Sequence, residues 1–310
     1  MTGKYKNDKI KPEVKTVIQT QNDKLIAAFN EKSTQKITAL FSDKLSQKVD
    51  NGFYNVINSF FTTVHSPHYS LLDEYYSINS STGMTGQVMS GVSNENDYSI
   101  TYPVSNKETY ISLLLSQEEN KDILVSCFYG KYGEEWKLEM LQFGQYAIFH
   151  KNAIDIYKEA QQDYKKGKIL DAVINLNLLK KVANPASDYF KYQKYEEMKE
   201  FQKQVYTEAS KKYPLPLLLS EVKTTPLIYD ILPNVTEEGI FPSISYKTKI
   251  DISDTTSLKK ENDELQQKLG EILPDLSKTK DIYFQAFNEL PVDENALVKY
   301  YGFIMKSANH

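Results

Sequence analysis

Hydrophobic residues in the first third of the chain recur at intervals of three and four residues, which places them on one face of a helix. Three helices are expected here, spanning Val14 to Phe29, Ile37 to Leu45 and Phe53 to Phe61. Ser33 is positioned to cap the second helix and Pro67 to end the third. The preceding residues, 1–13, are polar and rich in lysine, and we expect them to form a disordered tail.

Beyond residue 83 the pattern changes to an alternation with a period of two, which is typical of β-strands with unlike faces. Four segments show it, at residues 98–102, 111–115, 123–129 and 136–140. The links between them are short enough to join neighbouring antiparallel strands. The pattern therefore predicts an antiparallel meander, and residues 14–149 are expected to form an α+β domain in which helices cover a curved sheet.

This order of elements resembles the cone-shaped fold of nuclear-transport-factor-2-like and ketosteroid-isomerase-like proteins, in particular bacterial members of that superfamily. The resemblance lies in the segments KLIAAFNEKSTQKITALFSDKL and YGEEWKLEMLQF. It implies a fold rather than a function, because the superfamily includes enzymes, ligand-binding proteins and assembly domains. Its isomerase-type members place acid and base groups inside the cone, and no residue of this chain matches such a motif.

Residues 150–213 are predicted to be a helical connector. Ala160 and Tyr164 lie on the first arm of a helical hairpin, Gly167 breaks the helix, and Ala172 lies on the second arm. These positions resemble a single tetratricopeptide unit. Since a stable solenoid needs about three repeats, the resemblance implies a connector rather than a binding array. A longer helix is expected from Ser187 to Tyr213, where two prolines follow.

The last segment, residues 214–310, is expected to be a small α+β domain. Its predicted strands are residues 217–222, 227–232, 244–252 and 282–286, and its predicted helix runs from a cap at Asp254 to Ile272. Alternation in the third of these strands predicts one buried face and one wet face.

Tyrosines gather on one side of the predicted helix at Ser187 to Tyr213. At about 100° per residue, Tyr192, Tyr195 and Tyr206 form a stripe beside the main apolar face. Tyrosine buries its ring while its hydroxyl stays near water, as interface residues often do. We expect these three residues at a domain or protein interface with their hydroxyls at its rim. The stripe packs either on the C-terminal unit or on a partner chain.

Candidate catalytic and metal-binding residues are few. His65 and His68 have a spacing compatible with metal ligands, and Asp73 and Glu74 follow, but Pro67 indicates a loop. A surface loop is the preferred interpretation. Cys127 lies in an alternating apolar run and is expected to be a buried thiol rather than a nucleophile.

Two further patterns also predict no chemistry. Gly83, Gly86 and Gly91 lack the lysine and the Ser/Thr that follow a phosphate-binding loop. Glu134 and Glu135 are adjacent, so on a strand they would point to opposite faces. No catalytic residue, metal or cofactor is predicted.

Composition narrows the classes of partner. The chain has 310 residues and a formal net charge of −4, and its 37 basic residues are all lysine. Nucleic acid is therefore not expected as a partner. No apolar run approaches the ~20 residues of a membrane helix, and the N-terminus lacks a signal-peptide core. The chain is expected to be cytoplasmic as written, or exported if a leader has been removed.

Together these patterns predict a non-catalytic binding or interaction protein. Its expected partner is another protein or a small apolar ligand. The alternative is a small-ligand carrier or an enzyme that uses the cavity of the cone domain.

Overall fold

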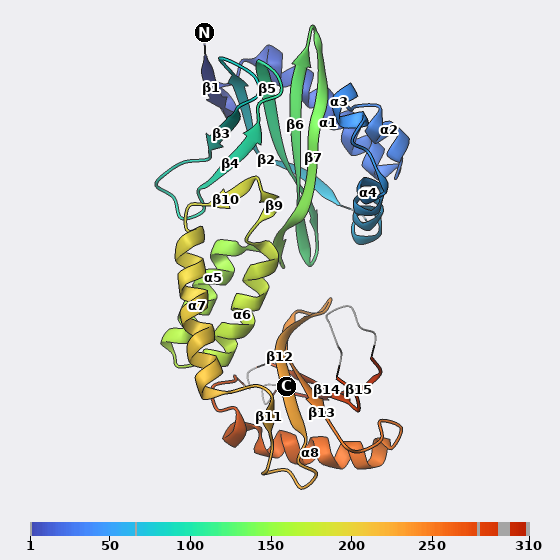
Figure 1. The fold of residues 1–310 in the computed structure, drawn as a ribbon, viewed down its shortest axis with the longest axis vertical. Coiled ribbons are helices and arrows are strands. Elements are labelled where there is room, and N and C mark those ends of the chain that lie inside the picture. Colours follow the sequence, from blue (N-terminus) through green and yellow to red (C-terminus); the bar gives the residue numbers. More distant parts are fainter. Residues whose placement is uncertain (1, 66, 278–279, 291–297, 308–310) are drawn as a thin grey trace. The chain divides into compact units, whose positions relative to one another are not determined.

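The computed structural model describes residues 2–65, 67–277, 280–290 and 298–307. The chain divides into two compact units (Figure 1). Unit 1 comprises Met1–Ala153 and Lys181–Tyr195, and unit 2 comprises Ile154–Lys180 and Glu196–His310. Both units combine helices with strands, so the predicted α+β class is confirmed. Most of the predicted connector belongs to the same unit as the C-terminal sheet.

Unit 1 is built on a curled antiparallel sheet with the strand order β1-β2-β5-β6-β7-β8 (Figure 1). Its strands are β1 (Gly3–Lys6), β2 (His68–Ile78), β5 (Glu108–Glu118), β6 (Lys121–Tyr132), β7 (Glu135–Ile148) and β8 (Lys151–Asn152). The short links predicted from the sequence join β5, β6 and β7, so this part of the meander is confirmed.

Four helices cover one face of this sheet: α1 (Pro12–Asn30), α2 (Thr34–Thr38), α3 (Asp43–Ser46) and α4 (Asn51–Thr63). Ser33 caps α2 as predicted, because its hydroxyl accepts a hydrogen bond from the Lys36 amide. The predicted second helix is divided into α2 and α3. The division occurs because the backbone between them pairs with β7: Leu138 donates to Leu40 O at 2.8 Å and Ser42 donates to Leu138 O at 2.8 Å.

The core of unit 1 lies between these helices and the sheet. Helix residues such as Ile18, Leu25 and Ile57 are 0% exposed, and they meet strand residues such as Val125 and Leu138, which are also 0% exposed. Burying each large apolar side chain contributes roughly 1.5–3 kcal/mol.

The predicted disordered tail is wrong. Residues 3–6 form β1, which pairs with the end of β2 from Gly3↔Ile78 to Lys6↔Tyr75. A short 3-10 helix, η1 (Asn7–Lys9), then leads into α1. The segment is polar, yet its backbone groups are satisfied by the ladder, and this pairing orders it.

The predicted four-strand meander is also wrong in one member. β4 (Tyr98–Pro103) lies in a separate three-stranded sheet, of order β10-β4-β3, with β3 (Thr85–Met89) and β10 (Phe190–Tyr192). Alternation identifies β4 as a strand but carries no information about its partners.

The predicted long helix begins later than expected. Residues 185–192 form β9 (Pro185–Asp188) and β10, and only α7 (Tyr195–Lys212) is helical. Phe190 is 1% exposed and stacks on Tyr98 with ring centroids 4.4 Å apart. Pairing of β10 with β4 therefore overrides the helical spacing of this segment.

In unit 2, three helices pack together: α5 (Ala153–Lys165), α6 (Ile169–Val182) and α7. Gly167 ends the first arm with φ of +74°, as the sequence predicts. Asn175 of α6 donates to Asp163 of α5 at 2.8 Å, and Phe201 of α7 meets the rings of Tyr157 and Tyr164. The described residues contain no helix that is both long and apolar enough to cross a membrane.

The second part of unit 2 is a five-stranded sheet with α8 (Thr255–Ile272). The strand order is β11 (Leu217–Leu218), β12 (Leu227–Val235), β13 (Ile240–Lys247), β14 (Ile282–Phe287) and β15 (Tyr300–Met305). β13 and β14 are parallel, and α8 connects them. Asp254 caps α8 as predicted, accepting from the Ser257 amide at 3.0 Å.

The expected wet face of the third strand is found from Lys247 onward, where Lys247, Lys249 and Asp251 are exposed, but not at the start of the strand. Ser243 and Ser245 are 6% and 9% exposed, and Ser245 donates to Gln285 on β14 at 3.1 Å. Short side chains between larger neighbours are shielded even on the face away from Ile244 and Tyr246, both 0% exposed.

Ala172 is 0% exposed within the three-helix group, as the sequence predicts. Ala172→Leu is expected to overpack this contact and to lower the free energy of unfolding by roughly 1–3 kcal/mol. Urea denaturation measures the change. Gln162→Leu, at an exposed position of α5, is the control. An unchanged midpoint for Ala172→Leu would show that the helices do not pack tightly there.

Glu261 is an unusual residue on the buried side of α8. It is 2% exposed, and neither carboxylate oxygen has a hydrogen-bond partner among the described residues. A buried polar group without a hydrogen bond costs about 1–3 kcal/mol in proteins.

We therefore expect Glu261→Met to raise the free energy of unfolding by about 1–3 kcal/mol at neutral pH, because it removes an unsatisfied carboxylate. Glu264→Met is the matched control, since Glu264 accepts a hydrogen bond from the Lys223 amide at 3.2 Å. Equal or lower stability of Glu261→Met in urea denaturation would contradict this expectation.

Candidate functional site

The three tyrosines of the predicted stripe do not share one surface. Tyr192 lies on β10 and is 1% exposed with its hydroxyl buried, so the expectation that its hydroxyl lies at a rim is wrong. Tyr195 is half-buried at the start of α7, with Lys191 Nζ 5.2 Å from its ring centroid. Tyr206, in unit 2, donates to Asn177 Oδ1 at 2.9 Å. Tyr192 leaves the stripe because it lies on β10, whereas Tyr195 and Tyr206 both lie on α7.

The two histidines of the predicted loop lie at its ends. His65 follows α4 and His68 is the first residue of β2, and both are exposed. Asp73 lies five residues farther along β2. Within the part of the chain that the structure describes, no group of three or more His, Cys, Asp or Glu side chains is arranged to hold a metal ion.

Asp73 is buried on β2 and has partners from distant segments. It accepts a hydrogen bond from Asn7 at 2.8 Å and forms an ion pair with Lys6 at 3.1 Å. The hydroxyls of Tyr75 and Tyr98 also donate to it. Burial raises the pKa of both tyrosines, so their hydroxyls stay protonated and can donate.

Glu74, the next residue, is held in a similar way. Lys15 of α1 pairs with it at 2.6 Å, and the Tyr110 hydroxyl donates to it at 2.5 Å. Asn7 Oδ1 accepts a hydrogen bond from the Glu74 amide at 2.9 Å. These carboxylates fasten the N-terminal segment and α1 to the sheet.

Cys127 is a buried thiol, as predicted. It is 0% exposed on β6, and burial raises its pKa to about 12. The thiolate needed for nucleophilic attack is therefore disfavoured. Gly86 also has a packing role, because a Cβ atom there would lie 2.5 Å from the ring of Tyr102.

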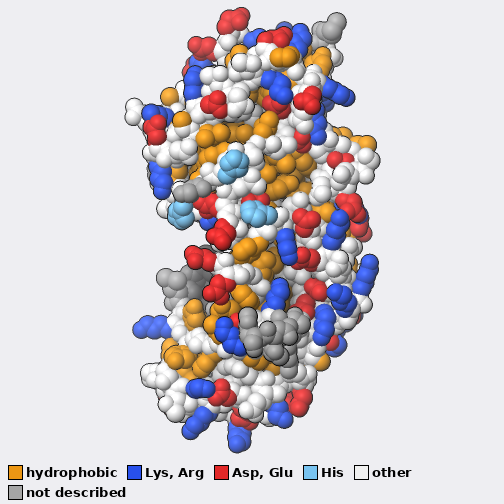
Figure 2. Space-filling view, turned by 180° about the vertical axis from the view of Figure 1, so that it is seen from behind, with side chains coloured by type: hydrophobic (Ala, Val, Ile, Leu, Met, Phe, Trp, Pro, Cys, Tyr) orange, Lys and Arg blue, Asp and Glu red, His pale blue; other side chains and the backbone are white. Residues whose placement is uncertain are grey.

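A pocket in unit 1 lies where α1 and α4 end beside the first residues of β2. Its volume is about 350 Å³. The described residues that line it are Phe29, Asn30, Lys32, Phe60, Phe61, Val64, His65, Pro67 and Tyr69. We call this site the aromatic pocket. Figure 2 shows histidine side chains beside exposed hydrophobic side chains on one face of unit 1.

Aromatic rings form the wall of the aromatic pocket. The ring centroid of Phe29 lies 5.1 Å from that of Phe60 and 6.2 Å from that of Tyr69. Phe143 of β7 packs against these rings, with its ring centroid 4.7 Å from that of Phe60. Such mutual contacts fix the rings in place, so the wall exists before a ligand arrives.

The polar lining of the aromatic pocket includes one lysine, Lys32, and one imidazole, His65. The described lining residues include no aspartate or glutamate. Burial raises the pKa of Tyr69 to about 12, so this third titratable group is a neutral hydroxyl at physiological pH. The lining therefore favours an uncharged or an anionic ligand over a cation.

Lys32 occupies a backbone position that normally suits glycine. Its φ is +51°, in the left-handed region, and it ends α1 with two bonds: Lys32 N donates to Phe29 O at 3.0 Å and Ser33 N donates to Ala28 O at 2.9 Å. This is a Schellman motif, in which glycine is the usual residue. A side chain at such a position costs roughly 1–2 kcal/mol.

The ends of α1 and α4 oppose the positive charge to a small extent. A helix C-terminus carries partial negative charge, worth about 0.3–1 kcal/mol near a charged group. The carbonyls of Ala28 and Phe29 are already bonded within the Schellman motif, which weakens the effect. Lys32 contributes a full positive charge to the lining, and the carboxylate of Glu118, outside the lining, bonds to the His65 amide.

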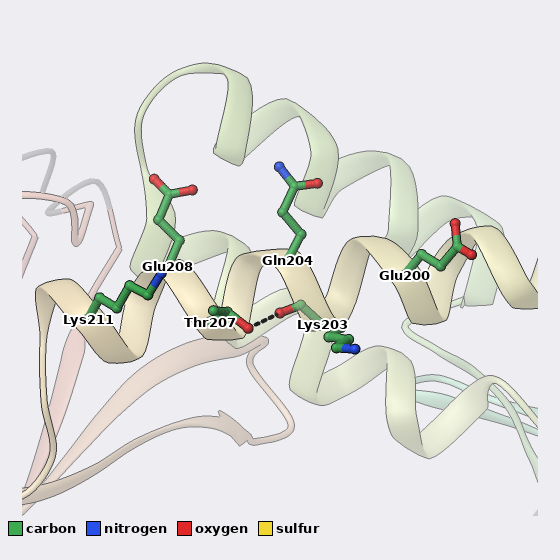
Figure 3. Close-up of a pocket in the computed structure, with 6 residues that line it drawn as sticks. All are labelled: Glu200, Lys203, Gln204, Thr207, Glu208 and Lys211. Atoms are coloured by element: carbon green, nitrogen blue, oxygen red, sulfur yellow. Dashed lines mark hydrogen bonds between the residues drawn. The ribbon is translucent and has the colours of Figure 1, made fainter.

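A larger hollow, about 500 Å³, lies along the outer face of α7 (Figure 3). The described lining residues all belong to this helix: Glu200, Lys203, Gln204, Thr207, Glu208 and Lys211. Acids and lysines alternate along it, and Thr207 bonds to Lys203 O of its own helix at 2.7 Å. This arrangement is typical of a solvated helix face rather than a binding site.

His65 is the one residue of the aromatic pocket that the sequence analysis had singled out as a candidate functional residue. The lining of the pocket comes from two parts of the chain, one at the end of α1 and one that runs from the end of α4 into β2. One sequence feature could have pointed to the pocket. Lys32 follows α1 at the place where a helix end commonly has glycine or asparagine.

No family model matches the chain, and neither a curated protein nor a solved structure matches it.

Proposed function

We propose that this chain is a non-catalytic binding protein that holds a small, largely apolar ligand in the aromatic pocket. The observation that carries the proposal is a pocket of about 350 Å³ with largely buried phenylalanine rings at its base and exposed polar side chains, Asn30, Lys32 and His65, around them. Small-molecule sites are typically concave, apolar and about 300–1,000 Å³ in volume. The proposal includes the two resemblances seen in the sequence, to the cone-shaped fold and to a single tetratricopeptide unit, because a binding role is consistent with both.

The filled interior of unit 1 supports a role without catalysis. An enzyme of the isomerase type would need an open cavity with convergent acid and base groups between helices and sheet. Here that space holds apolar side chains. Among its buried polar groups, Asn22 donates to Ser112 at 3.0 Å and accepts from Tyr129 at 2.9 Å.

Blocking the aromatic pocket is expected to abolish binding. Asn30 is exposed and lines the pocket, so Asn30→Trp would place a ring in the cavity without disturbing the core. N-phenyl-1-naphthylamine, a neutral fluorescent probe, should bind the unchanged protein saturably. We expect Asn30→Trp to weaken this binding at least about ten-fold, which corresponds to about 1.4 kcal/mol.

Gln19→Trp is the matched control, because it adds the same ring at an exposed position of α1 outside the pocket. Thermal unfolding of both variants establishes that they fold. If the probe does not bind saturably, or binds both variants equally, the aromatic pocket is not the binding site.

A further inference from the structure

We infer that the ligand of the aromatic pocket is an amphipathic anion: a small aromatic or aliphatic body that carries one carboxylate, sulfonate or similar acidic group. This inference rests on the proposed function and adds the chemical class of the ligand. The apolar body would contact Phe29, Phe60 and Tyr69, and the acidic group would lie at the mouth near Lys32 and His65.

The lining supplies the first argument for an anion. Its two basic side chains lie on different elements, one after α1 and one after α4, yet both face the same cavity. Two acids lie beside the lining: Glu31 pairs with Lys36 at 2.5 Å, and Glu118 accepts a hydrogen bond from the His65 amide and pairs with Lys121 at 3.5 Å. Their charges are therefore partly compensated by groups other than the ligand.

The backbone at Lys32 supplies an independent argument. A left-handed position in a Schellman motif suits glycine, and a lysine there strains the backbone. Residues held in strained conformations cluster at functional sites, where the side chain has a use that offsets the strain. Because Lys32 also lines the aromatic pocket, contact between its ammonium group and an anion is such a use.

Aromatic walls alone would also accept a cation through the faces of their rings. Lys32 argues against that ligand, because a cation in the aromatic pocket would meet its ammonium group at the mouth. A fully apolar ligand would leave both basic groups unused. An amphipathic anion would contact the aromatic rings with its apolar body and the basic groups with its acidic group.

Two related probes separate these cases. 8-Anilinonaphthalene-1-sulfonate and N-phenyl-1-naphthylamine share a ring system, and only the first carries a sulfonate. We expect the sulfonate probe to bind at least about ten-fold more tightly at low salt, with a difference that shrinks as ionic strength rises. Asn30→Trp must remove the signal of both probes, which excludes binding elsewhere on the protein.

Single substitutions test which side chains cause the preference for the sulfonate probe. Lys32→Gly should weaken binding of the sulfonate probe several-fold, leave the neutral probe within about two-fold, and raise the melting temperature because glycine suits the backbone. His65→Gln should weaken the sulfonate probe without a rise in melting temperature. Lys24→Gln, an exposed position of α1 outside the pocket, should change neither probe.

The outcomes distinguish this inference from the proposed function. If neither probe binds saturably, the proposed function fails. If both bind equally, or if Lys32→Gly and His65→Gln leave the sulfonate probe unchanged, the pocket binds ligands but the anion class is wrong. Preference for the sulfonate probe that is lost in both variants supports the inference.

Discussion

The packing of α1 to α4 against one face of the curled sheet is the contact on which the rest of unit 1 depends. It fills the space between the layers with residues such as Ile18, Leu25 and Leu138, all 0% exposed. Interiors packed to this degree leave few voids larger than a water molecule. One opening lies at the margin, where α1 and α4 end beside the first residues of β2. The aromatic pocket is therefore a consequence of helix lengths as much as of its own side chains.

Buried carboxylates on β2 fix the N-terminal segment on this framework. Asp73 and Glu74 are adjacent, and each is compensated by a lysine and by tyrosine hydroxyls. Asn7 links the two, since it donates to Asp73 and accepts from the Glu74 amide. A buried charge without such partners would be costly, so the polar N-terminus is ordered by the acids it neutralises. Glu261 on α8 shows the opposite case, a buried carboxylate without a hydrogen bond among the described residues.

The sequence predicted the elements with regular local patterns and missed those that depend on distant partners. Caps at Ser33 and Asp254 and the break at Gly167 were correct, because each depends on a few neighbouring residues. β2 was missed because its polar residues, such as Asp73, are satisfied by groups far away in the sequence. Phe190 was assigned to a helix because its pairing with Ile100 is invisible to local periodicity. The aromatic pocket was not predicted for the same reason, since its lining combines segments about thirty residues apart in the sequence.

The most direct test of the central claim is to map a bound ligand on the protein by amide chemical shifts. A titration of ¹⁵N-labelled protein with 8-anilinonaphthalene-1-sulfonate would locate the site without any substitution. The account predicts saturable shifts that are largest at Asn30, Lys32, His65 and Tyr69, which line the aromatic pocket. Shifts that are largest on unit 2, or that grow without saturation, would contradict it.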